Sequence, residues 1–246
     1  MLFGTRPSRI EWDASTYIGK RLVNEDSVLA LEDGDRFLFV VADGLGGHGM
    51  GKEAATLVTE VFKYEFCEFS NCSSFLDYAF SKAQWAVLKS QEERGLHNQM
   101  KTAVSALVIN KGKFAYGHIG DTRVYLFKNQ KLVDRTLDHS VPQMLVFSGE
   151  IKEEDIKSHP DRSRLLYVIG DNWKTPKYEI SKQKSAKKGM SFFLATDGVW
   201  EVVPNPTPEK WQTPDIWLRS VMEKVHNACR ISESFDNFSA IAVMMR

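Results

Sequence analysis

The sequence predicts an α+β protein in which strands and helices occur in separate blocks. Strand-like segments rich in β-branched and aromatic residues come first, two amphipathic segments follow, and strand-like segments then return. A doubly wound parallel sheet would need regular alternation of strands and helices, which this order lacks. The pattern therefore favours antiparallel strand blocks with a pair of helices laid against a sheet.

Turn signals and the spacing of apolar residues predict the first block of strands and the helices after it. Strands are expected at 11–16, 27–31 and 36–41, with a turn at Asp33–Gly34, and together they indicate a meander. Apolar residues then recur at helical spacing over 52–69 and again over 74–90. These two segments are expected to form a helical hairpin that covers a sheet.

The second half of the chain repeats strand-like segments and ends on one. Strands are expected at 102–110, 113–118 and 123–128, as a second meander, and at the closing run 238–245. Short helices are expected at 141–147 and 152–157, in a mixed polar stretch that is expected to cover the functional site. An amphipathic helix is expected at 215–229. The basic segment 182–188 is expected to be a solvated loop.

Composition restricts the class of protein. The 246 residues with 43% apolar content suit one large domain over 1–246, and the formal net charge of zero offers no global field for nucleic acid or an anionic membrane. Residues 1–10 lack the apolar core of a secretory peptide, and no apolar run is long enough to span a bilayer. Three cysteines are an odd number for a disulfide framework. We therefore expect a cytoplasmic, monomeric protein with reduced thiols and no membrane insertion.

Acidic residues stand at the ends of several apolar runs. The runs 37–44, 116–121 and 192–198 each reach an aspartate at a sharp turn, namely Asp43, Asp121 and Asp197. Asp236 directly precedes the closing run, and Glu25–Asp26 precede the strand at 27–31. A carboxylate at the end of a buried strand is costly unless a cation meets it. Several such ends brought together predict a divalent-metal site.

The glycine-rich stretch after Asp43 matches two phosphate-binding patterns by spacing alone. Residues 44–49 fit the dinucleotide fingerprint, and residues 46–52 fit most of a P-loop. Asp43 would repel a pyrophosphate at the first pattern, and Glu53 stands where the second needs serine or threonine. No nucleotide cofactor is expected, and the simpler interpretation is a tight turn that exposes the Gly44 backbone beside Asp43.

Six segments carry a resemblance to a known family. They are Arg21–Ser27, Val41–His48, Gly117–Arg123, Leu137–Ser140, Leu194–Glu201 and Asp236–Ala240. In this order they resemble the successive signatures of metal-dependent protein phosphatases of the phosphatase 2C (PPM) type, and the stand-alone bacterial catalytic domains are the nearest likeness. The likeness extends from Arg21 to Ala240. It implies two antiparallel sheets packed as a sandwich, helix pairs on both outer faces, and a site at one end.

The resemblance also implies a ligand set for Mn²⁺ or Mg²⁺. Asp43 would bridge two ions, Asp197 and Asp236 would complete the shell of one, and the Gly44 carbonyl would join the other. Asp26 and Glu25 would serve the second ion or orient its waters. Asp121 and Asp197, with Glu201 where the family usually has aspartate, would hold a third ion. Oxygen ligands of this kind suit hard cations.

The implied reaction is hydrolysis of phosphoserine or phosphothreonine in proteins. Two metal ions lower the pKa of a bridging water, which then attacks phosphorus directly. Arg21 is, by position, the family's phosphate-binding arginine, and its planar fork matches two phosphate oxygens. A surface salt bridge from Arg21 to Glu25 is the alternative structural role for this arginine. Arg21 and Asp43 are thus the expected catalytic residues.

One departure concerns the leaving-group proton. Relatives with a histidine directly after Asp-Gly use it as a proposed general acid, whereas this chain has Leu45 there. His48 and His139 are the candidate replacements, and a metal-bound water is a third. The alternative role of His139 is a turn histidine bonded to a nearby carbonyl, and that of His48 is a loop residue before a helix.

Two functions remain after these comparisons of motifs. The first is a Ser/Thr protein phosphatase acting on substrates of a eukaryotic-type Ser/Thr kinase in bacterial signalling. The second is a catalytically weak phosphatase-fold module that binds phosphoproteins or a regulator. Every expected metal carboxylate is present, which favours the enzyme. Neither function calls for nucleic acid as a partner.

Overall fold

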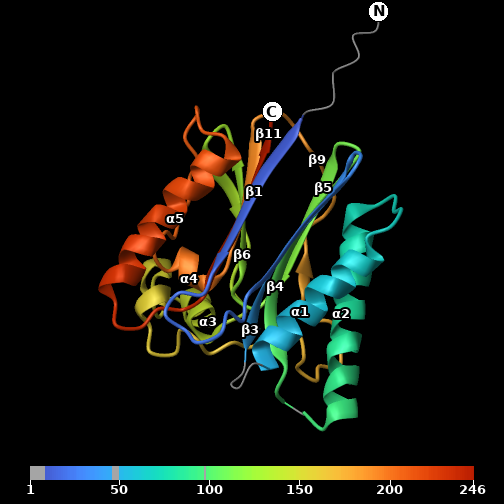
Figure 1. The fold of residues 1–246 in the computed structure, drawn as a ribbon, viewed down its shortest axis with the longest axis vertical. Helices are drawn as coiled ribbons and strands as arrows, with labels where there is room; N and C mark the ends of the chain where they lie inside the picture. The colour runs from blue at the N-terminus through green and yellow to red at the C-terminus, as the bar shows by residue number, and fades with distance from the viewer. Residues whose placement is uncertain (1–8, 46–49, 97) are drawn as a thin grey trace, which may run out of the picture.

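Two antiparallel β-sheets lie face to face in the computed structural model, which describes residues 9–45, 50–96 and 98–246 (Figure 1). The first sheet has the order β2-β3-β4-β5-β8, and β9 also pairs with β5. Its strands are β2 (Ser27–Asp33), β3 (Arg36–Leu45), β4 (Lys101–Asn110), β5 (Lys113–Ile119), β8 (Glu179–Ile180) and β9 (Lys184–Ser185). The second sheet has the order β1-β11-β10-β6-β7. Its strands are β1 (Ile10–Tyr17), β6 (Arg123–Lys128), β7 (Lys131–Arg135), β10 (Met190–Ala195) and β11 (Phe238–Met245).

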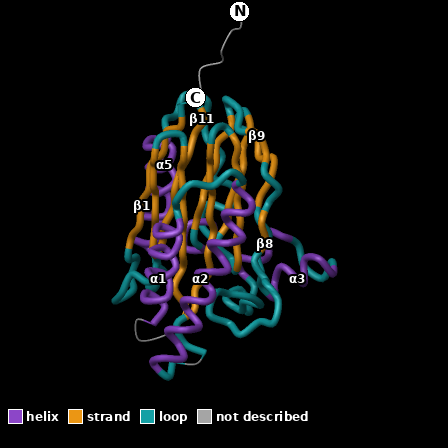
Figure 2. Tube along the Cα trace, turned by 90° about the vertical axis from the view of Figure 1, so that its right-hand side faces the viewer, coloured by secondary structure: helices purple, strands orange, loops and turns teal. Residues whose placement is uncertain are grey.

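Helices cover the outer face of each sheet. The hairpin of α1 (Met50–Glu65) and α2 (Cys72–Arg94) packs on the first sheet, and α5 (Pro214–Ile231) with the one-turn α4 (Asp197–Trp200) packs on the second. Figure 2 shows α1 and α2 in front of the strands, and α3 (Val141–Ser148) to one side beyond β8. A 3₁₀ turn (Glu153–Ser158) follows α3. The layered αββα fold confirms the predicted sandwich.

The ends of α2 show why the chain folds locally as it does. Asn71 caps the first turn by accepting a hydrogen bond from the Ser74 amide at 3.0 Å. Gly95 ends the helix in the left-handed region at φ +66°, where only glycine is unstrained. Asn71 thus sets where α2 begins after α1, and Gly95 sets where the chain leaves α2 before returning as β4.

Strand β3 is buried on both faces, and this double burial positions Asp43. Phe37, Phe39 and Val41 face the core between the sheets, while the residues between them contact the helical layer. Because side chains alternate along a strand, Asp43 continues the inter-sheet face at the strand's end. The strand therefore directs a carboxylate into the space between the two sheets.

The expectation of two separate meanders is wrong. β1 pairs with β11 in the second sheet, and β6 pairs with β10, so the continuous meander is β2-β3-β4-β5. Local patterns predict strands but not their pairing partners, and here the first strand, β1, pairs with the last strand, β11. The small strands β7, β8 and β9 were also not expected, and β9 lies inside the segment 182–188 that was predicted to be a loop. None of the helices in the described parts of the chain could cross a bilayer.

Candidate metal centre

A cavity of about 780 Å³ is lined by several segments, among them the last residues of β3. This end of β3 lies at the end of the sandwich away from the chain's C-terminus (Figure 1). The wall of the cavity combines segments that are far apart in sequence. The acidic lining residues are Glu25, Asp43, Asp121, Asp197 and Asp236. Arg21, Gly44 and Asn237 line the same cavity. The structure thus brings together the carboxylates that the sequence placed at the ends of separate runs, with Asp26 buried beside them.

Burial makes these carboxylates electrostatically unfavourable when charged. Desolvation, with the negative charge of Asp197 added, raises the pKa of Asp43 well above its usual range. Desolvation and the charge of Asp121 do the same for the pKa of Asp197. Burial also raises the pKa of both Asp26 and Asp121 to about 7. Without a cation among them, these groups would hold protons that an aspartate ordinarily loses.

Unpartnered oxygens show that the cluster fits a cation. Oδ1 of Asp26, Asp121 and Asp197 is buried in each case and has no hydrogen-bond partner among the described residues. An orphaned buried oxygen is costly unless another group satisfies it. A donor set made of carboxylate oxygens matches hard divalent cations such as Mg²⁺ and Mn²⁺. Among the described residues, no three of these carboxylates bring ligand oxygens within 4.8 Å of one another.

Asp26 is oriented by two hydroxyl groups. Its Oδ2 accepts hydrogen bonds from Ser239 Oγ at 2.6 Å and from Thr196 Oγ1 at 3.2 Å. Thr196 Oγ1 in turn accepts the Ser239 amide at 3.0 Å, which links the end of β10 to β11. This arrangement occupies Oδ2, whereas Oδ1 of Asp26 has no hydrogen-bond partner among the residues that the structure describes.

Asn237 holds the β1–β2 loop, which carries Arg21 and Glu25, in place. Its Oδ1 accepts the Glu25 amide at 2.8 Å, and its Nδ2 donates to the carbonyl oxygens of Ile18 and Val23 at 2.8 and 3.1 Å. Asn237 therefore connects the segment before β11 to the β1–β2 loop. The Asp236 carboxylate beside it accepts a 2.6 Å hydrogen bond from Arg21 Nη2.

Gly44 lies where no side chain fits. A Cβ atom there would come within 2.3 Å of the Gly51 backbone and 2.6 Å of the Glu25 carbonyl oxygen. Thr102 Oγ1 donates a 2.7 Å hydrogen bond to the Asp43 carbonyl oxygen. The close approach of α1 and the β1–β2 loop thus depends on glycine at this position.

The Asp121 turn is held from two sides. Trp200 Nε1 donates to the Asp121 carbonyl oxygen at 2.9 Å. On the other side, the His139 amide donates to the Gly120 carbonyl oxygen at 2.8 Å, and the Gly120 amide donates to His139 Nδ1 at 3.3 Å. Gly120 has φ +90° and packs against Ala103, so this position also requires glycine.

A buried ion pair supports the same turn. Arg123 donates from Nε and Nη2 to the two carboxylate oxygens of Asp138 at 2.7 and 2.6 Å. Both side chains are almost fully buried, and the guanidinium carbon lies 3.5 Å from the centre of the Trp200 ring. Arg123 thus connects β6, the strand after Asp121, to Trp200, whose indole bonds the Asp121 carbonyl oxygen.

Two predicted site residues, Arg21 and Glu201, have contacts that differ from those expected. Arg21 pairs with Asp236, so the alternative salt bridge to Glu25 is not the contact that forms. Glu201 lies 3.2 Å from Arg162 Nε and is absent from the cavity lining described above. Burial, partly offset by Arg162, raises the pKa of Glu201.

The two candidate general-acid histidines have different outcomes. The His139 ring contacts Gly120, His118, Tyr167 and Glu179, and none of these lines the cavity. The alternative role was a turn histidine bonded to a nearby carbonyl. The main-chain amide of His139 bonds the Gly120 carbonyl oxygen, whereas its ring accepts the Gly120 amide. His48 lies outside the described residues.

Sequence reasoning missed several supporting residues. Asn237, Thr196 and Ser239 orient the carboxylates, and all three stand inside or beside the quoted motifs. Trp200 is a further supporting residue, because its indole bonds the Asp121 carbonyl oxygen. Thr196 and Asn237 stand directly beside Asp197 and Asp236, and this was the available signal.

Comparisons with known proteins agree with this architecture. The family model described as Protein phosphatase 2C matches residues 15–234. The chain is similar to the serine/threonine protein phosphatase PstP of Mycobacterium tuberculosis, with 30% identity over 199 residues. This match covers 80% of the chain but only 37% of PstP, so the chain spans little more than a third of that relative's length.

Solved structures show the same fold. The crystal structure of M. tuberculosis PstP/Ppp has a TM-score of 0.83 and 25% identity, covering 96% of this chain and 99% of that one. A PstP catalytic domain in complex with two manganese ions has a TM-score of 0.79 and 23% identity, covering 96% of this chain and 97% of that one. Since the family match extends over most of the sequence, the chain belongs to the protein phosphatase 2C family.

Proposed function

We propose that this protein is a metal-dependent phosphatase that hydrolyses phosphoserine and phosphothreonine in proteins. The observation that carries the proposal is the cavity lined by aspartates from four separate segments. In and beside it, Oδ1 of Asp26, Asp121 and Asp197 is buried with no hydrogen-bond partner in the described part of the chain. The name of the similar PstP, a serine/threonine protein phosphatase, supports the substrate class.

Mn²⁺ or Mg²⁺ is the proposed cofactor, with at least two ions bound. When bound, such ions make water a better nucleophile near neutral pH and neutralise charge on the phosphoryl oxygens. Asp43, Asp197, Asp236 and the Gly44 carbonyl would hold them, with Asp26 and Glu25 beside them. Asp121, with Asp197 and Glu201, would hold a third ion. For Glu201 this requires release of Arg162, because the two side chains now pair.

Arg21 is proposed to bind the phosphate. Its guanidinium is half-exposed, lines the cavity and is already held by Asp236. A guanidinium can donate to two phosphate oxygens at once and is charged at every working pH. Because the described lining of the cavity contains no imidazole, His139 is not proposed as the general acid.

The wider setting is also a proposal. Three free cysteines, Cys67, Cys72 and Cys229, suit a reducing compartment such as the cytoplasm. The substrates are proposed to be phosphoproteins made by a eukaryotic-type Ser/Thr kinase, and the protein is proposed to act as a monomer. A phosphoproteome compared with and without this chain would identify the substrates, and sedimentation would give the oligomeric state.

The test is hydrolysis of a phosphothreonine peptide and of p-nitrophenyl phosphate with Mn²⁺, with Mg²⁺ and after chelation. Asp43→Asn should reduce kcat/KM by more than about a hundredfold, because losing a direct ligand costs more than losing its outer partners. Asp215→Asn is the matched control, since Asp215 is exposed on α5, is not among the residues that line the cavity, and pairs with Thr213 and Arg219. Absence of metal-dependent turnover in the unmodified protein would overturn the proposal.

The same measurement separates the enzyme from a phosphoprotein-binding module. A module would bind the phosphothreonine peptide in a way that needs Arg21 but would release no phosphate. Binding without turnover in the unmodified protein would therefore favour the second function.

A further inference from the structure

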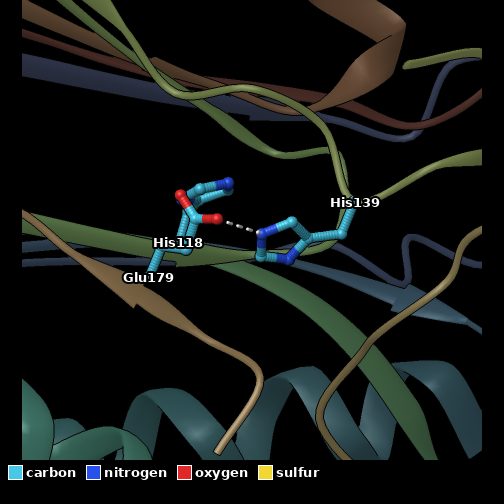
Figure 3. A group of neighbouring side chains, drawn as sticks. All are labelled: His118, His139 and Glu179. Carbon is cyan, nitrogen blue, oxygen red and sulfur yellow. Dashed lines mark ion pairs between the residues drawn. The ribbon is translucent and has the colours of Figure 1, made fainter. Parts of the chain in front are cut away.

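Three metal-ligating side chains meet outside the cavity lined by Glu25, Asp43, Asp121, Asp197 and Asp236, which is called the carboxylate cavity below. His118 lies on β5, Glu179 on β8, and His139 in the loop after β7. One ligand atom from each lies within 4.8 Å of the other two. Figure 3 shows the Glu179 carboxylate and the His139 ring pointing toward each other, with the His118 ring beside the carboxylate. The ring centres of the two histidines are 4.5 Å apart.

The two imidazoles are neutral and therefore able to coordinate. His118 is buried, and its Nε2 is 2.8 Å from the Leu137 carbonyl oxygen. Since a carbonyl only accepts, this nitrogen carries the proton and the other nitrogen keeps its lone pair. Burial lowers the pKa of His118 to about 3 and also lowers the pKa of His139.

An ion could reach this cluster from solvent. The Glu179 side chain is 72% exposed. A cavity of about 400 Å³, separate from the carboxylate cavity, is lined by His118 and Glu179 and has room for an ion with its waters. Of the basic residues there, Arg135 pairs with Glu153 and Lys184 with Asp134, which offsets their charge, and Lys182 also lines the cavity.

The choice of metal follows from the donor atoms. Two imidazole nitrogens and one carboxylate, completed by water, form a common ligand set for Zn²⁺. Imidazole also suits copper, iron and nickel, whereas Mg²⁺ and Mn²⁺ prefer sites made of oxygen. This cluster therefore differs in donor chemistry from the carboxylate cavity.

Coordination would change one hydrogen bond to the Asp121 turn. The Gly120 amide donates to His139 Nδ1 at 3.3 Å, so the proton of the neutral ring is on Nε2, which faces Glu179 at 3.6 Å. A metal at Nε2 needs the lone pair there, so the proton moves to Nδ1 and no net proton is released. Nδ1 then becomes a donor and can no longer accept the Gly120 amide.

We propose that His118, His139 and Glu179 form a second metal site, which binds Zn²⁺ or a similar transition-metal ion and whose occupation releases the Gly120 amide from His139. Gly120 directly precedes Asp121, so occupation of this site is linked to the geometry of the carboxylate cavity. The inference is independent of the proposed phosphatase activity, because it depends on separate residues and a separate ion.

Binding is tested with Co²⁺, whose visible absorption is strong in sites of low coordination number that contain nitrogen. The intact protein is stripped with a chelator, saturated with Mg²⁺ to occupy the carboxylate cavity, and titrated with Co²⁺. We expect one equivalent to produce a visible band and one equivalent of Zn²⁺ to abolish it. Absence of the band, together with no Zn²⁺ uptake by calorimetry, overturns the proposal.

Variants assign the ligands. Glu179→Gln should weaken Co²⁺ and Zn²⁺ binding at least about tenfold, since it removes the only anionic ligand. Because Glu179 is exposed, this variant should melt at the same temperature as the unmodified protein. Asp134→Asn is the matched control, since Asp134 lines the same cavity without belonging to the cluster. Equal loss of affinity in both variants, or in neither, overturns the assignment.

The coupling to Gly120 has its own readout. In ¹H–¹⁵N spectra of the Mg²⁺-saturated protein, one equivalent of Zn²⁺ should shift the Gly120 amide resonance. In Glu179→Gln, the same Zn²⁺ concentration should leave that resonance in place. Zn²⁺ binding with an unchanged Gly120 amide would overturn the proposed link between this cluster and the Asp121 turn.

Discussion

Arg21 and Asp236, which are 215 positions apart in the sequence, are joined by a 2.6 Å hydrogen bond from Nη2 to Oδ2 at the mouth of the carboxylate cavity. The contact with Asp236 raises the pKa of Arg21, and both side chains stay partly exposed. The guanidinium is therefore held at the cavity by one of its donors while others remain available. This geometry suits an arginine that receives a phosphate.

Replacing Arg21 should therefore weaken substrate binding more than folding. Arg21→Ala removes charge-assisted hydrogen bonds, which are worth about 1.5–3 kcal/mol, so kcat/KM for a phosphothreonine peptide should fall about 10- to 100-fold. Lys20→Ala is the control, because Lys20 lines the same cavity but bonds the Ser232 carbonyl oxygen. Similar losses in both variants would indicate a general charge effect rather than phosphate recognition by Arg21.

Gly44 should tolerate no side chain. Gly44→Ala places a methyl group within 2.6 Å of two backbone segments, so we expect a loss of several kcal/mol in stability and weaker Mn²⁺ binding. Gly112→Ala is the control, since that glycine has φ +71° with open space around it and should cost only about 1–2 kcal/mol. Urea unfolding and calorimetric Mn²⁺ titration measure both effects. Equal destabilisation of the two variants would contradict the steric argument.

The Arg123–Asp138 pair should be important for stability. Asp138→Asn leaves a buried guanidinium without its counter-charge, which typically costs about 3–5 kcal/mol. For a chain of this size each kcal/mol shifts the melting temperature by about 2–4 °C. Glu93→Gln, which removes an exposed pair with Lys89, should change stability by less than about 0.5 kcal/mol. A similar melting temperature for the two variants would count against the role of the buried pair.

The metal-free protein should lose stability as pH rises through neutrality. Burial raises the pKa of Asp26 and Asp121 to about 7, whereas an aspartate in the unfolded chain titrates near 4. Between these values the folded state holds protons that the unfolded state has lost, so stability falls with increasing pH up to and through 7. His118, whose pKa burial lowers to about 3, makes stability rise with increasing pH, but only at acidic pH.

Urea midpoints measured in chelator near pH 6.5 and pH 8.5 test this sign, because above about 6.5 an unfolded histidine is already mostly neutral. The midpoint should be lower at the higher pH, and added Mn²⁺ should raise it most there. Asp26→Asn should reduce the pH dependence. A chelated protein that is more stable at the higher pH would show that these carboxyl groups are not buried in uncharged form.

Much of the architecture could be predicted because it follows from local patterns. The apolar spacing gave the α1–α2 hairpin and α5, and the β-branched runs gave β2, β3, β4 and β11. The residues at the strand ends then pointed to a cation, because Asp43 and Asp197 follow fully apolar runs. The division into one domain, the metal ligands and their individual roles stay predictions.

The pairing of β1 with β11, the crossing of the chain between sheets at Asp121, and the contacts of His139 and Glu201 could not be predicted in this way. Each depends on segments that are distant in sequence, and no local propensity distinguishes one partner strand from another. Residue periodicity alone thus determined the longer strands and helices and which carboxylates lie at strand ends. Only the packing of the two sheets decided which of those carboxylates share a cavity, because burial and charge repulsion act between neighbours in space.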